Sequence, residues 1–240
     1  MRPSFKPIIF GLTAGLGLMA LRPAPGPSIA QRIVDPATEP ITMHCKNDSD
    51  QVFGNIGALE RSLKRQGRTL RFAMNGGMYT TDRSPLGLYV EKGVTLKPID
   101  RRTKGYGNFF MQPNGVFGIT GDHKAFVVRT EDYVPRKGVE FATQSGPMLV
   151  TKGTINPLFK AGSTNLNIRN GVGVLPDGRV VFAISREPVN FHDFARYFLE
   201  QGCSDALYLD GFVSKAFIPE QGVQDLDGDL GVLIAVVGRN

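Results

Sequence analysis

The sequence has few of the residues that build metal and redox centres, with 3 histidines and 2 cysteines among 240 residues. The histidines are His44, His123 and His192, and their spacing matches no zinc motif. The glycine patterns of dinucleotide-binding sites and P-loops are also missing. We therefore expect a protein that binds no metal and uses no cofactor.

The sequence also lacks an apolar run long enough to span a bilayer. Its longest run covers residues 8–21, whereas a membrane-spanning helix needs about twenty residues. Basic residues precede this run and a small-residue sequence ending in Ala30 follows it, which is the order of a secretory signal peptide. We predict a signal peptide at 1–30, cleaved after Ala30, and one domain at 31–240. A retained membrane anchor is the alternative.

No cluster of one charge sign is present. The formal net charge is +6, and Arg2, Lys6 and Arg22 lie in the predicted signal peptide, which leaves +3 for the mature domain. The remaining basic residues are scattered along the chain, a pattern that argues against a nucleic-acid partner. We expect a secreted or periplasmic protein with no membrane span after signal cleavage.

The two cysteines, Cys45 and Cys203, both follow the predicted signal peptide. A pair of cysteines in an oxidising compartment favours a disulfide, here between the N-terminal segment and the later core. Two unrelated buried thiols are the alternative.

Two segments have the periodicity of amphipathic helices. The first extends from about Asn55 to Gln66 and is followed by Gly67, a residue typical of helix ends. The second begins at Asn190, a suitable N-cap, and ends at Gly202.

Most other apolar runs are short and typical of β-strands. Turns at 91–93 and 176–178 each separate two such runs and predict hairpins. Further strands are predicted at residues 70–73, 116–119, 126–128, 148–150, 206–209 and 230–237. Many strands with only two helices predict an α+β domain with a mixed or largely antiparallel sheet.

Several predicted strands end in short clusters of Gly, Asn, Ser and Asp. The clusters are residues 75–79, 113–117, 144–147, 169–173 and 209–214. Each cluster alone is explained by a turn that needs positive φ. Their recurrence indicates a functional site built from several loops.

These clusters, taken in order, resemble the phosphodiester glycosidase family, which includes the lysosomal enzyme that uncovers mannose 6-phosphate and many exported bacterial proteins. The resemblance extends over about residues 72–237 and rests on ordered motifs at 73–79, 85–88, 107–110, 114–117, 144–150, 169–173 and 206–211. One departure follows Asp210, where the uncovering enzyme's branch has a glycine-rich stretch and then serines, whereas residues 211–214 read Gly-Phe-Val-Ser. The resemblance implies hydrolysis of a glycosyl-1-phosphodiester in envelope or extracellular glycans, and leaves the sugar open.

Cleavage between a sugar C1 and a phosphate oxygen requires a carboxylate near the reacting carbon and a cation for the phosphodiester. Asp210 ends an apolar strand and is the predicted nucleophile or general base. Arg169 is predicted to hold the phosphate with its fork of donors, and Ser145 is the third catalytic candidate. A turn-forming aspartate and a buried ion-paired arginine are the alternatives for the first two.

The remaining polar residues of these motifs are candidates for binding the carbohydrate or glycosyl phosphodiester, through side chains or through backbone amides near glycine. They are Asn75, Gly76, Asn114, Gln144, Asn170, Ser214 and Glu91. Glu91 and Asp82 are also candidates for a second carboxylate, although Glu91 beside a turn is equally explained by exposure to solvent.

Three other interpretations remain open. A Ser145–His192–Asp210 hydrolase is one, although Ser145 lacks the Gly-x-Ser-x-Gly elbow. A non-catalytic glycan-binding or exopolysaccharide-associated module is the second. Residues 225–229 superficially resemble a calcium loop, but they lack the spacing of an EF-hand, and a polar turn explains them better.

Overall fold

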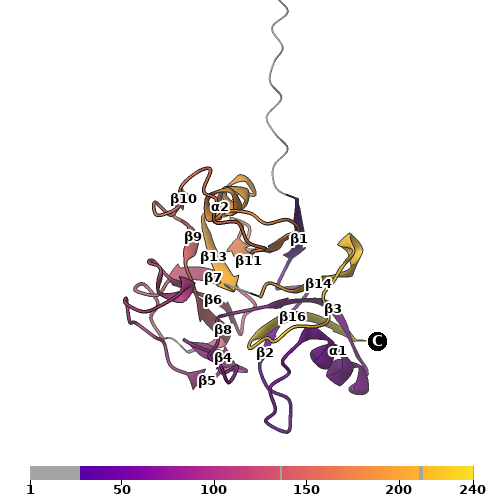
Figure 1. Cartoon of the computed structure of the whole chain (residues 1–240). Helices are drawn as coiled ribbons and strands as arrows, with labels where there is room; N and C mark the ends of the chain where they lie inside the picture. The colour runs from indigo at the N-terminus through magenta and orange to yellow at the C-terminus, as the bar shows by residue number, and fades with distance from the viewer. Residues whose placement is uncertain (1–27, 136, 211–212, 240) are drawn as a thin grey trace, which may run out of the picture.

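The computed structural model describes residues 28–135, 137–210 and 213–239, which form an α+β domain dominated by strands (Figure 1). The described strands belong to three sheets, and the strand pairs within each sheet are antiparallel. The predicted fold class is therefore confirmed.

The first sheet has six strands and contains the second predicted hairpin. Its order is β1 (Ile29–Val34), β12 (Val180–Ser185), β11 (Asn170–Val174), β13 (Asp205–Asp210), β9 (Met148–Thr151) and β10 (Thr154–Ile155). The turn at 176–178 joins β11 to β12, as predicted.

The other two sheets have five strands each. The second has the order β15 (Val223–Gln224), β14 (Ala216–Ile218), β3 (Arg68–Asn75), β16 (Leu233–Arg239) and β2 (Ile41–His44). The third has the order β5 (Val94–Lys97), β4 (Tyr89–Glu91), β8 (Val139–Ser145), β6 (Gly115–Thr120) and β7 (Ala125–Arg129). The predicted hairpin at 91–93 joins β4 to β5.

Both predicted helices are present, and both begin at the expected caps. The Asn55 side chain accepts from the Ala58 amide at 2.8 Å at the start of α1 (Ile56–Arg65). The Asn190 side chain accepts from the Asp193 amide at 2.9 Å at the start of α2 (Phe191–Glu200). These caps satisfy amides that would otherwise lack partners in the first turn. Short 3-10 helices occur at η1 (Asn108–Phe110) and η2 (Pro219–Gln221).

The three sheets meet around a shared hydrophobic core. Phe182 of β12 packs against Phe72 of β3 with ring centroids 4.8 Å apart, and against Phe117 of β6 at 5.7 Å. Each of these rings comes from a different sheet and is fully buried. The helices lie outside this centre, α1 against the second sheet and α2 against the first (Figure 1).

The predicted signal peptide lies almost wholly outside the described residues, which begin at 28. β1 starts at Ile29 and pairs with β12 along its whole length, so cleavage after Ala30 would leave Gln31–Val34 to form the strand. Within the described ranges, none of the helices is long and apolar enough to cross a lipid bilayer.

The predicted Cys45–Cys203 disulfide is wrong, because both thiols are free and buried in different places. Cys45 belongs to the central core, whereas Cys203 packs under α2 beside Phe198 and Gly173. Burial raises the pKa of Cys45 to about 11 and that of Cys203 to about 12. The two cysteines are therefore the buried thiols of the alternative interpretation.

Candidate functional site

Three strands from three different sheets end in a polar residue at the same place. Asn75 ends β3, Ser145 ends β8 and Asp210 ends β13. Asn170, the first residue of β11, lies directly opposite Asp210 in the antiparallel register. All four side chains are buried, with Asp210 the most exposed at 6%. The antiparallel topology thus gathers polar residues that are far apart in the sequence.

Hydrogen bonds connect Asn75, Asn170 and Asp210 into a closed ring. The Asn75 amide donates from Nδ2 to Oδ2 of Asp210 at 2.5 Å. The Asn170 amide donates to Oδ1 of Asn75 at 2.9 Å, and its own Oδ1 accepts from the Asp210 backbone amide at 3.1 Å. Each asparagine therefore uses both ends of its amide, which fixes the position of the carboxylate.

Two serines join this ring. The Ser145 hydroxyl donates to the Leu209 carbonyl at 2.6 Å, one residue before Asp210. The Ser214 hydroxyl lies 3.4 Å from Oδ1 of Asn170 and donates to the Ile168 carbonyl at 3.2 Å. We call Asn75, Ser145, Asn170, Asp210 and Ser214 the Asp210 network.

The charge of Asp210 acts on two tyrosines that sequence reasoning did not assign to the catalytic set. Burial raises the pKa of Tyr208 to about 12, and the Asp210 charge adds to this against the opposing effect of Arg169. Burial also raises the pKa of Tyr79 to about 12, together with the charges of Asp210 and Asp229. Both phenols therefore stay protonated at neutral pH. Tyr208 lies two residues before Asp210, a spacing that puts two side chains on the same face of a strand.

Arg169 lies beside the Asp210 network, with its guanidinium packed between β13 and α2. Its Nε donates to the Val189 carbonyl at 2.8 Å, and one Nη donates to the Asn165 carbonyl at 3.0 Å. The guanidinium carbon is 3.6 Å from the centre of the Phe191 ring, and the other Nη lies 3.4 Å from the Tyr208 hydroxyl. Arg169 is 1% exposed, so its geometry is that of a cation holding secondary structure elements together.

Gln144 and Asn114 are buried, but their side chains bond backbone groups outside the Asp210 network. Oε1 of Gln144 accepts from the amides of Leu88 and Asp100 at 3.0 and 2.9 Å, and its Nε2 donates to the Asp100 carbonyl at 2.6 Å. Nδ2 of Asn114 donates to the Phe109 carbonyl at 3.0 Å. Both amides therefore connect loops to the third sheet.

Gly76 and the next glycine let the end of β3 approach its neighbours closely. The Gly76 amide donates to the Val232 carbonyl at 2.7 Å, and a Cβ on Gly76 would lie 2.9 Å from Cγ1 of Val232. A Cβ on Gly77 would lie 2.2 Å from Oγ1 of Thr143 and 2.6 Å from the Gln144 carbonyl oxygen. Gly76 is therefore required by packing against Val232, and Gly77 by packing at the junction of β3 and β8.

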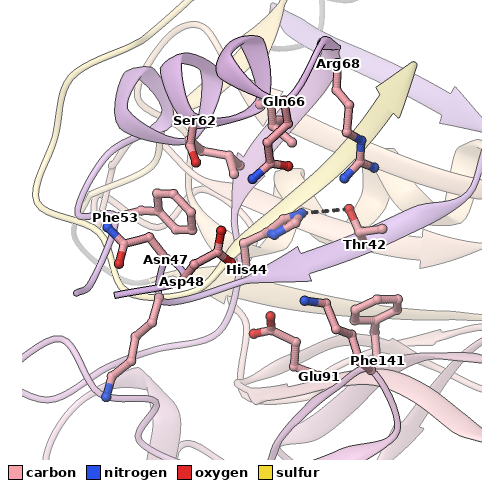
Figure 2. Close-up of a pocket in the computed structure, with 14 residues that line it drawn as sticks. Thr42, His44, Asn47, Asp48, Phe53, Ser62, Gln66, Arg68, Glu91 and Phe141 are labelled. Carbon is pink, nitrogen blue, oxygen red and sulfur yellow. Dashed lines mark hydrogen bonds between the residues drawn. The ribbon is translucent and has the colours of Figure 1, made fainter. Parts of the chain in front are cut away.

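Glu91 lies in a different pocket, of about 280 Å³, which none of the Asp210 network lines (Figure 2). Figure 2 shows Arg68 and Thr42 near His44, with Glu91 on the opposite side of the space. His44 and the Thr42 hydroxyl are 2.9 Å apart. Burial, together with the charges of Arg68 and Lys92, lowers the pKa of His44 to about 4.

Asp82, the other candidate for a second carboxylate, is held within its own exposed turn. It accepts from the hydroxyls of Thr80 and Ser84, and these bonds lower its pKa to about 2. The structure therefore places neither Asp82 nor Glu91 in the Asp210 network.

The proposed Ser145–His192–Asp210 triad is not assembled. Nδ1 of His192 lies 3.3 Å from Oδ1 of the neighbouring Asp193, whereas the Ser145 hydroxyl donates to the Leu209 carbonyl. A serine nucleophile needs its base within hydrogen-bond reach, so this interpretation is wrong.

The acidic residues of 225–229 bind other parts of the protein. Asp227 pairs with Nζ of Lys215 at 2.9 Å, Asp229 pairs with Arg83, and Asp225 accepts from the Ala216 amide at 3.3 Å. Within the described part of the chain, no three His, Cys, Asp or Glu side chains gather as a metal site would require. The segment is a polar turn that closes over the start of β14.

A pocket of about 360 Å³ adjoins the Asp210 network through Ser214. Its charged lining residues are Arg186, Lys215 and Asp225. The backbone amide of Lys215 donates to Oδ1 of Asn75 at 2.8 Å, which attaches this pocket to the ring around Asp210. Sequence reasoning missed Lys215, because a lysine after a serine carries no motif of its own.

This combination of fold and polar strand ends corresponds to one class of protein. A family model described as phosphodiester glycosidase matches residues 68–231. The chain therefore belongs to the phosphodiester glycosidase family, whose members are associated in general with hydrolysis of glycosyl phosphodiesters. The chain is also 39% identical over 186 residues to the Escherichia coli K12 protein YigE, which is described as uncharacterized, and the match covers 77% of this chain and 72% of that protein.

Solved structures share the fold at low sequence identity. The zebrafish N-acetylglucosamine-1-phosphodiester alpha-N-acetylglucosaminidase catalytic domain, auto-inhibited by its pro-peptide, superposes with a TM-score of 0.56 at 14% identity, covering 89% of this chain and 84% of that one. A Burkholderia pseudomallei K96243 protein, provisionally described as exported, has a TM-score of 0.59 at 12% identity over 87% of this chain and 73% of that one. At these identities the likeness concerns the fold alone.

Proposed function

We propose that this protein is an exported hydrolase that cleaves glycosyl-1-phosphodiesters between the sugar C1 and the phosphate oxygen, in envelope or extracellular glycans. One observation carries the proposal: the Asp210 carboxylate is held at 2.5 Å by the Asn75 amide at the junction of three sheets. Membership of the phosphodiester glycosidase family supports the reaction class.

Asp210 acts as the nucleophile or general base of this reaction. The hydrogen bond donated by Asn75 stabilises the ionised carboxylate, and it fixes which oxygen is turned toward the asparagine. As a general base, Asp210 takes a proton from water while the water oxygen bonds to C1, and the C1–O electron pair leaves with the phosphate. A phosphate leaving group needs little protonation, so one carboxylate suffices.

The other members of the network orient Asp210 and the sugar. Asn170 fixes the backbone of Asp210, and Ser145 fixes the preceding carbonyl. Ser214 lines the adjoining pocket, where its side chain can contact a ligand. Arg169 holds Tyr208 beside the carboxylate and is a positioning residue in this proposal.

Export is part of the proposal and rests on the signal-like order of residues 1–30. A fold neighbour that is provisionally described as exported is consistent with it. Mass spectrometry of the protein purified from a periplasmic fraction would give the mature N-terminus. A start near Gln31 is expected, and a full-length chain retained in the cytoplasm would contradict export.

The reaction is tested with a panel of α- and β-linked glycosyl-1-phosphodiesters, with sugar release followed by chromatography. Asp210→Asn should lower turnover at least about 100-fold, the range that a positioned acid or base contributes. Asp205→Asn, at the other end of β13, is the matched control and should retain activity. Sugar binding without turnover by the wild-type protein would favour the non-catalytic glycan-binding alternative.

A further inference from the structure

A phosphodiester substrate carries a negative charge, and the structure does not offer Arg169 as its partner. The guanidinium of Arg169 is 1% exposed, stacked on Phe191 and already donating to backbone carbonyls. Turning it toward a ligand would break these bonds, the stacking on Phe191 and the contact with the Tyr208 hydroxyl. The cation that binds the phosphate therefore lies elsewhere.

The pocket beside Ser214 has the charge and position that Arg169 lacks. It is formed where β12 ends, where β14 begins and where the chain enters β15, and its lining includes Ser185, Arg186, Ser214 and Lys215. Its volume of about 360 Å³ lies within the range of small-ligand sites. Asp225 also lines the pocket, with Oδ2 accepting from the Ala216 amide.

Lys215 connects this pocket to the Asp210 carboxylate through Asn75. Its backbone amide donates to Oδ1 of Asn75, and the Asn75 amide donates to Asp210. Its ammonium now pairs with Asp227 at 2.9 Å, and the side chain of Asp227 is 81% exposed. The Lys215 side chain is 27% exposed, but Asp227 faces solvent, so the ion pair contributes little and a bound anion can replace Asp227.

Arg186 supplies the second cation. It is exposed, and its one recorded side-chain contact is a long hydrogen bond of 3.5 Å to the Gln221 carbonyl. Its planar guanidinium can donate to two phosphate oxygens at once, whereas Lys215 provides a compact charge.

We propose that this pocket binds the phosphodiester anion, with Arg186 and Lys215 as its cations. The proposal rests on the proposed function and assigns the phosphate side of the substrate to this pocket. The sugar then extends from Ser214 toward Asp210.

Calorimetric titration with inorganic phosphate and with glucose 1-phosphate tests the pocket without requiring turnover. Binding should weaken about tenfold or more in Lys215→Gln and in Arg186→Gln, because each removes a charge-assisted hydrogen bond. Arg179→Gln, at the opposite end of β12 and paired with Asp177, is the matched control and should bind as the wild type does. Methyl glucoside, which lacks the anion, should give no difference between these variants.

A third variant is expected to bind phosphate more tightly, which a misfolded protein would not do. Asp227→Asn removes the carboxylate that competes for Lys215, so phosphate should bind severalfold more tightly. Phosphate binding that is unchanged in Lys215→Gln, Arg186→Gln and Asp227→Asn would overturn the proposal.

Failure of the pocket and failure of the proposed function give different results. Hydrolysis by the wild type with an unchanged KM in Lys215→Gln and Arg186→Gln would refute the pocket and leave the activity standing. Phosphate binding that depends on Lys215, retained in Asp210→Asn, with no hydrolysis of any diester, would support the pocket and refute the activity.

Discussion

Asn75 and Asp210 end strands of two different sheets, and the Asn75 amide donates to the Asp210 carboxylate at 2.5 Å. The same asparagine accepts from Asn170 and from the Lys215 amide through Oδ1. The Asn75 side chain thus fixes the position of the Asp210 carboxylate and of the chain that enters β14 at Lys215. Its amide character matters, because a carboxylate in its place could not donate.

Asn75→Asp should create a pair of carboxylates within hydrogen-bond distance. Two such groups cannot both ionise freely, so the apparent pKa of the pair rises above the value of an unfolded aspartate. A raised pKa in the folded state means stability that is present at low pH and lost as pH increases. The variant should therefore melt closer to the wild type at pH 5 than at pH 7.5.

Calorimetric melting at the two pH values measures this difference. Asn55→Asp is the matched control, because aspartate is an equally good N-cap at the start of α1. If Asn75→Asp loses the same stability at both pH values, the carboxylates do not interact.

Arg169→Met should destabilise the protein by about 2 kcal/mol or more, since it removes a buried guanidinium whose hydrogen bonds and stacking join the segment before β11 to α2 and β13. Arg169→Lys should recover little, because an ammonium cannot reproduce the planar stacking on Phe191. Denaturant unfolding gives the free energies. Arg179→Met, at an exposed position just before β12, should change stability by less than about 0.5 kcal/mol. Equal effects at the two sites would show that Arg169 is not structural.

The stability of the wild type should fall as pH decreases from 6.5 to about 4, because burial and the charges of Arg68 and Lys92 lower the pKa of His44 from its ordinary value of 6.5 to about 4. The unfolded chain binds this proton in that range and the folded chain does not. The loss should reach at most about 3 kcal/mol and be complete below pH 4. Urea unfolding of wild type and His44→Gln across this range isolates the effect, and parallel curves would rule it out.

Gly77→Ala should destabilise the protein by about 2 kcal/mol or more and lower any activity with it. The added Cβ would overlap Oγ1 of Thr143 and the carbonyl oxygen of Gln144, which forces β3 away from β8. Gly121→Ala is the control, since its Cβ would lie 3.8 Å from the nearest atom. Thermal melting of both variants compares them, and a tolerated Gly77→Ala would show that the junction can expand.

Local sequence signals were sufficient for the helices and hairpins. Asn55 and Asn190 are good caps wherever they precede an amphipathic segment, and the turns at 91–93 and 176–178 need only their own residues. The arrangement into three sheets has no such local signal, because it depends on pairings such as Asn170 with Asp210, forty residues apart.

The site was partly predictable for the same reason. Polar residues at strand ends identified Asn75, Ser145 and Asp210 individually, but the direction of a neighbouring side chain depends on strand alternation and bulges. Gln144 and Ser145 are adjacent and serve different places, the third sheet and the Asp210 network. Arg169 precedes Asn170, and the strand register shifts directly after Asn170. The Arg169 side chain therefore packs against the start of α2, where it bonds the Val189 carbonyl and stacks on Phe191.

The meeting of β3, β8 and β13 also has a consequence for cooperativity. No sheet contains the network by itself, so a folding intermediate with one sheet still undocked has no positioned carboxylate. In the proposed hydrolase, activity therefore requires complete tertiary assembly, and partial opening of any one sheet should abolish it before global unfolding begins. Amide hydrogen exchange at the ends of these three strands should therefore follow a single opening event rather than three.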